Sequence, residues 1–96
     1  MAIALILQFE GFDSDKYDAV QEALGLAGNG GVWPDGIISH LAGNTPQGWC
    51  VIDVWESQAH FDRFFAERLN MAFDKVGGLS KPRITAVDIH NLYQRS

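Results

Sequence analysis

Apolar residues recur along the chain with two different periods, and the alternation between these periods predicts the order of the elements. Four segments have the length and the β-rich composition of strands: residues 2–10, 36–42, 49–56 and 83–93. Two other segments repeat apolar residues at helical spacing, one from Tyr17 to Ala27 and one from Phe61 to Phe73. The order β-α-β-β-α-β predicts one ferredoxin-like α+β domain over residues 1–96, with a four-stranded antiparallel sheet.

Polar and glycine-rich stretches mark the ends of these elements. Ser14 is the expected N-cap of the first helix, and Ser57 is the expected N-cap of the second. The first helix leads into a glycine-rich loop, GLAGNGGVWPDG. The sequence GNTPQG is expected to join the second and third strands as a hairpin loop, and paired glycines end the second helix.

The predicted strands are apolar on both faces, which is unusual for a small sheet. In the third strand, one face carries Cys50, Ile52 and Val54, and the other carries Trp49, Val51 and Trp55. Two helices can cover only one face of such a sheet, and the second face is too apolar to remain in water. We therefore expect a homodimer in which two sheets pack face to face and close a barrel.

Charge and composition exclude several classes of function. The formal net charge is −5, and Lys and Arg form no runs, so nucleic-acid binding is not expected. The apolar start of the chain is too short for a membrane span and lacks the features of a signal peptide. The single cysteine, Cys50, favours a reducing compartment, and the expected location is the cytoplasm.

One histidine and one aspartate in the predicted hairpin are the first candidates for chemistry. If Ala42 pairs with Trp49, then His40 and Asp53 share a face of the sheet as diagonal neighbours, about 7–8 Å apart. Asp53 could then hold one tautomer of His40, and the imidazole could act as a general base. In the alternative interpretations, the two side chains only satisfy each other at a dimer interface or bind backbone groups at a sheet edge, or they bind a ligand without chemistry.

The stretch VIDVWESQAHFDRFFAERL resembles the third strand and second helix of the dimeric α/β-barrel superfamily, the antibiotic biosynthesis monooxygenase-like group. The shared feature is a strand ending in Val54 and Trp55, followed by Glu56, the capping Ser57, and Phe61. The resemblance implies a dimeric barrel with a pocket between the helices and the concave face of the sheet. It also implies a range of activities, from cofactor-free oxygenases to proteins of no known activity.

The haem-degrading members of this superfamily need residues that this chain lacks. They carry a tryptophan where this chain has Phe64, and a proximal histidine where this chain has residues 70–75 without one. They carry an asparagine on the first strand, where the nearest polar residue here is Gln8. The expected cofactor is therefore none, and the scattered histidines predict no metal site.

The resemblance suggests which other side chains could bind a ligand. Trp55, Phe64 and Phe65 could shape a pocket for a flat apolar molecule, although most aromatic residues of the chain are expected in the core. Arg68 could point its charge inward at a phenolate or carboxylate, or extend outward into solvent. His90, on the expected last strand, could line the cavity or dock against the partner chain.

Two functions from different classes remain open. The first is a cofactor-independent monooxygenase-like enzyme that acts on a small aromatic or polyketide-like molecule, with His40 and Asp53 as the catalytic base. The second is a non-catalytic dimeric barrel that binds a small apolar ligand or serves in a stress response.

Overall fold

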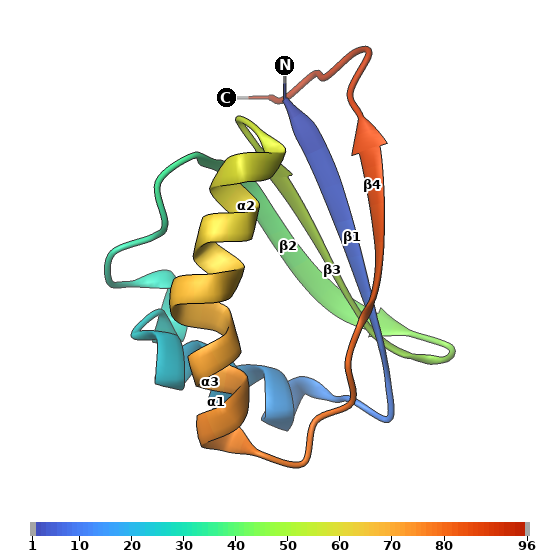
Figure 1. Cartoon of the computed structure of the whole chain (residues 1–96). Coiled ribbons are helices and arrows are strands. Elements are labelled where there is room, and N and C mark those ends of the chain that lie inside the picture. Colours follow the sequence, from blue (N-terminus) through green and yellow to red (C-terminus); the bar gives the residue numbers. More distant parts are fainter. Residues whose placement is uncertain (1, 96) are drawn as a thin grey trace.

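The computed structural model describes residues 2–95 and confirms the predicted order of elements. The strands are β1 (Ile3–Glu10), β2 (Ile37–Thr45), β3 (Gly48–Trp55) and β4 (Arg83–Asp88). The helices are α1 (Ser14–Leu24), α2 (Gln58–Phe64) and α3 (Asn70–Val76). One antiparallel sheet has the strand order β2-β3-β1-β4, and all three helices lie on the same side of it (Figure 1). This is the ferredoxin-like α+β fold.

Two strand boundaries differ from the predicted ones by more than one residue. β2 continues to Thr45, so the hairpin closes through Pro46 and Gln47 alone, where a longer loop was expected. The polar residues before Pro46 are compatible with a strand because β2 is an edge strand and none of its residues is fully buried. At the other end of the chain, β4 stops at Asp88, so His90 lies beyond the sheet.

The second helical region is a single rod made of three parts. α2 and α3 are joined by a π-helical segment, Phe65–Leu69, and together they run without a break from Gln58 to Val76 (Figure 1). Ser57 caps its start as predicted, since the hydroxyl accepts a hydrogen bond from the His60 N–H. A π-helical segment shifts the residues after it around the helix axis, and such segments occur often at functional sites.

The N-cap of α1 is Asp13, one residue before the predicted Ser14. The Asp13 carboxylate accepts a hydrogen bond from the Lys16 N–H at 3.0 Å. A carboxylate is also favoured at the positive end of the helix dipole, which explains why Asp13 takes the position that a serine could fill. Gly25 ends the helix with a φ of 78°, a left-handed conformation that suits glycine.

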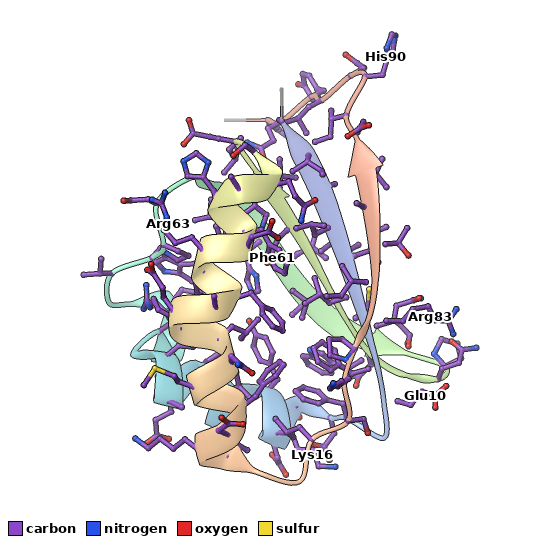
Figure 2. All side chains as sticks on the ribbon, viewed as in Figure 1. Glu10, Lys16, Phe61, Arg63, Arg83 and His90 are labelled. Carbon is purple, nitrogen blue, oxygen red and sulfur yellow. The ribbon has the colours of Figure 1, made fainter. Side chains whose placement is uncertain are left out.

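The core lies between the helices and the sheet face that they cover. Alternate residues of β1, such as Leu5, point to this face, and Trp55 of β3 is fully buried there. Phe61 extends from α2 toward the sheet, whereas Arg63 points away from it (Figure 2). Each large apolar side chain buried in this way contributes about 1.5–3 kcal/mol to folding.

The opposite face of the sheet is also apolar. A row of neighbouring side chains crosses all four strands there, from Leu41 through Ile52 and Ile6 to Thr85. Leu41 is 59% exposed, and Val87 on the same face is 42% exposed. The two-sided pattern read from the sequence is therefore present in the fold, and the homodimer that it suggests stays a prediction.

Candidate functional site

The β2–β3 hairpin brings His40 and Asp53 into direct contact. The two residues lie exactly opposite each other in the ladder, and His40 Nδ1 lies 2.6 Å from Asp53 Oδ1. The predicted register was wrong by two residues, because Ala42 pairs with Val51 and not with Trp49. A shift of two residues preserves the face on which each side chain lies, so the predicted pair still forms.

Tyr17 on α1 completes a three-residue network that the sequence analysis missed. Its hydroxyl lies 2.5 Å from Nε2 of His40, across 23 positions of sequence. The sequence indicated only that Tyr17 belongs to the apolar face of its helix, and the phenol ring does pack against the core. No local signal identifies its hydroxyl as a partner of His40, because the contact depends on how α1 docks on the sheet.

The chemistry of the three groups determines which atom donates and which accepts in each hydrogen bond. An ionised Asp53 carboxylate can only accept, so Nδ1 of His40 carries a proton and donates to it. In the neutral imidazole Nε2 is then an acceptor, and the Tyr17 hydroxyl donates to it. If Nε2 gains a proton, this hydrogen bond reverses and the phenol oxygen accepts. The network can therefore hold a proton at either Tyr17 or His40.

The network is shielded from solvent. Asp53 is only 5% exposed, and Trp33 packs on the His40 imidazole with ring centroids 5.2 Å apart. Burial raises the pKa of the Tyr17 phenol above its usual 10.0, and the nearby Asp53 and Asp18 carboxylates raise it further. Each of these effects disfavours the phenolate, so Tyr17 is a neutral hydrogen-bond donor at neutral pH.

A cavity between the sheet and the helices reaches this network. Tyr17, His40 and Asp53 lie at its wall with Gln21, and the rest of the lining is apolar or aromatic, including Trp33 of the glycine-rich loop. The cavity has a volume of about 50 Å³. That space holds about three to five water molecules, so a ligand of several rings needs the walls to move.

Only one of the three predicted aromatic ligand-binding residues lines this cavity. Phe64 lies in its wall. Trp55 is fully buried beneath Phe61 and Phe64 and belongs to the core. Phe65 packs against Phe61 with the two rings tilted, and it is not part of the cavity lining.

Arg68 is not among the residues that line this cavity, and of its two predicted orientations the inward one is not seen. Its guanidinium donates to the backbone carbonyls of Val32 at 3.1 Å and Leu24 at 2.9 Å, and it lies 5.8 Å from the Phe64 ring centre. These contacts tie the π-helical segment to the last residue of α1 and to the loop between α1 and β2. Because Leu24 and Trp33 line the cavity, the contacts restrain its wall.

His90 lies far from the cavity. It is in the exposed segment after β4 and points away from the body of the molecule (Figure 2). The strand was expected to continue through His90, and its end at Asp88 removes this residue from the sheet. Within a single chain, the exposed position of His90 gives no support for its predicted role in ligand binding.

Neither a metal cluster nor a membrane span is evident between residues 2 and 95. Among these described residues, no three His, Cys, Asp or Glu side chains are placed to hold a metal ion together. No helix in the same part of the chain is long and apolar enough to cross a bilayer.

Comparisons with known proteins identify the fold. No protein-family model matches the sequence, and no curated protein matches it. A protein of unknown function from Nitrosomonas europaea, NE2512, superimposes with a TM-score of 0.72 and 20% identity, over 99% of this chain and 95% of that chain. SnoaB, a cofactor-independent oxygenase from Streptomyces nogalater, superimposes with a TM-score of 0.63 and 11% identity, over 98% of this chain and 96% of that one.

A protein provisionally described as an antibiotic biosynthesis monooxygenase, from Chloroflexus aurantiacus, superimposes with a TM-score of 0.68 and 14% identity, over 98% of each chain. The chain thus has the fold of the antibiotic biosynthesis monooxygenase-like proteins, as the sequence resemblance implied. At these identities the likeness concerns the fold, and the chemistry must be argued from the residues of this chain.

Proposed function

We propose that the chain is a cofactor-independent monooxygenase-like enzyme that acts on a small aromatic or polyketide-like molecule in the cavity between the sheet and the helices. The observation that carries this proposal is the hydrogen bond between His40 and Asp53 at the wall of an apolar cavity. The similarity in fold to a cofactor-independent oxygenase is consistent with it.

The proposed reaction begins with removal of a proton from the substrate. His40 accepts the proton, and Asp53 stabilises the imidazolium that forms. The substrate becomes an electron-rich anion, which is the species that reacts with molecular oxygen in this kind of chemistry. The apolar lining, including Phe64, keeps water away from the reactive anion.

Oxygen consumption and mass spectrometry test the proposal together. The purified protein is first examined for a co-purifying small molecule, and oxygen uptake is then measured with hydroxylated one-ring to three-ring aromatic compounds. His40→Ala is expected to reduce the rate by about 10²–10⁴. Asp53→Asn, which keeps the shape of the side chain, is expected to reduce it as well. An unchanged rate in a folded His40→Ala variant excludes His40 as the base.

The narrow cavity favours a second candidate function. A dimeric barrel that binds a small apolar ligand without chemistry could use the same lining, and a space of about 50 Å³ suits a ligand of one ring or less. The two functions differ in one measurement. A binding protein retains its ligand chemically unchanged and consumes no oxygen, whatever residue stands at position 40.

A further inference from the structure

Both ring nitrogens of His40 are already occupied. Nδ1 lies 2.6 Å from the Asp53 carboxylate, and Nε2 lies 2.5 Å from the Tyr17 hydroxyl. Each imidazole nitrogen has one in-plane position for a hydrogen bond. A ligand in the cavity therefore cannot exchange a proton with His40 directly while these two contacts persist.

The Tyr17 oxygen, in contrast, can still accept a hydrogen bond. A phenol can donate one hydrogen bond and accept another at the same time, and Tyr17 donates its proton to His40. Tyr17 lines the cavity beside His40, so both its ring and its hydroxyl belong to the wall that a ligand would meet. The side chain is half-buried and packed against the Trp49 ring at 5.2 Å, which limits its movement.

We infer that Tyr17 is a catalytic residue that relays a proton from the ligand to His40, so that the phenol oxygen contacts the ligand and the imidazole does not. This inference rests on the proposed proton-abstraction function and assigns the atom that performs its first step. As the ligand's acidic O–H or C–H bond breaks, its proton passes to the Tyr17 oxygen. At the same time the proton of Tyr17 passes to Nε2.

The charges balance without any further reactant. The electron pair of the broken bond stays on the ligand, which becomes an enolate or phenolate. Tyr17 ends as a neutral phenol, and His40 ends as an imidazolium beside the Asp53 carboxylate. Tyr17 carries no net charge before or after the step, which fits a buried phenol whose pKa is raised by its surroundings.

The face of α1 that carries Tyr17 also carries a second polar side chain. Gln21 follows Tyr17 by one helical turn, is 8% exposed, and lines the same cavity. Its amide can donate to a carbonyl or accept from a hydroxyl. The two side chains together fit a planar ligand with two oxygen-bearing positions, of which one is an ionisable hydroxyl or an enolisable ketone.

Deuterium exchange into acetophenone, an enolisable aromatic ketone with a single ring, tests the relay without requiring oxygen. Proton NMR measures the exchange rate for the unaltered chain, Tyr17→Phe, His40→Ala and the control Tyr93→Phe, which makes the same change at a residue that is 82% exposed. We expect the rate to fall by about 10²-fold or more in both Tyr17→Phe and His40→Ala. Tyr93→Phe is expected to match the unaltered chain.

The outcomes separate the relay from the proposed function. If Tyr17→Phe exchanges as fast as the unaltered chain while His40→Ala is inactive, the relay is wrong and the proposed base remains. If His40→Ala retains the full rate, or the unaltered chain does not exceed buffer, the proposed function fails and the relay fails with it. Nitrogen NMR of the Tyr17→Phe variant shows whether Nδ1 of His40 still carries its proton. A retained proton shows that the lost rate does not come from disruption of the His40–Asp53 hydrogen bond.

A binding measurement completes the test. Phenol and its methyl ether, anisole, have the same ring, but only phenol can donate a proton. We expect the unaltered chain to bind phenol more tightly than anisole, and Tyr17→Phe to lose that preference. A preference that survives in Tyr17→Phe contradicts contact between the ligand and the Tyr17 oxygen.

Discussion

Val51 and Ile52 are adjacent in β3, yet they lie on opposite faces of the sheet. Val51 is 8% exposed and packs in the core beneath the helices, whereas Ile52 stands in the apolar row that crosses the open face. A strand places consecutive side chains on opposite faces, so the same substitution at these two positions tests two different surfaces.

We predict that Ile52→Asp yields a folded monomer and that Val51→Asp does not fold. A carboxylate at position 51 would be buried in the core without a partner, whereas at position 52 it would be tolerated by a single chain but not by a sheet-on-sheet interface. Light scattering gives the mass of each species, and circular dichroism reports folding. The unaltered chain is expected at about twice 10.6 kDa. A folded monomer of the unaltered chain contradicts the predicted homodimer.

We predict that the thiol of Cys50 reacts slowly with a disulfide reagent in the native protein. Cys50 lies on the open face between Gly43 and Gln8, where a partner sheet would cover it. In Ile52→Asp the same thiol is expected to react about as fast as in an unfolded sample. Equal rates for the unaltered protein and the variant show that no partner covers this part of the sheet.

We predict that Tyr17 ionises above pH 10. The chain contains two tyrosines, so in Tyr93→Phe the ultraviolet absorbance of tyrosinate reports Tyr17 alone. Its midpoint is expected above 10.0, because burial and the Asp53 and Asp18 carboxylates raise the pKa of the phenol. A midpoint at or below 10.0 in the folded protein contradicts the burial of this hydroxyl.

The raised pKa of Tyr17 also has a consequence for stability. The neutral phenol is favoured in the folded state, so its contribution is fully present below the unfolded-state pKa of about 10. The contribution is lost as the pH rises through the higher folded-state pKa. Denaturant titrations at alkaline pH are expected to show a steeper loss of stability for the unaltered chain than for Tyr17→Phe.

We predict that Arg68→Gln loosens the loop over residues 25–36. The variant loses the hydrogen bonds to the Val32 and Leu24 carbonyls, which together stabilise the loop by about 1–3 kcal/mol. Amide hydrogen exchange is expected to accelerate in the loop and to remain slow in β1 and β3. Arg63→Gln is the matched control, because Arg63 is on the outer side of the same helix (Figure 2).

The opening of this loop should also widen the cavity, since Trp33 is part of both. Arg68→Gln is therefore expected to bind two-ring aromatic probes faster than the unaltered chain. If loop exchange and binding rates stay unchanged, Arg68 does not restrain the cavity wall.

The sequence determined the order of the elements and the face on which each strand residue lies. Strand periodicity places Leu5 and Ile6 on opposite faces, and likewise Trp55 and Ile52, whatever the pairing. Only the structure shows that the helices cover the face of Leu5 and Trp55. His40 and Asp53 could be predicted as partners for the same reason, because a two-residue error in register leaves both on one face.

Only the tertiary structure decided which other groups join this pair. Tyr17 reaches His40 through the docking of α1 on the sheet, and Arg68 binds the carbonyls of Val32 and Leu24. Periodicity describes one element at a time. The distances between elements depend on side-chain packing across the whole core, and the hydrogen bonds of the site form only after that packing is set.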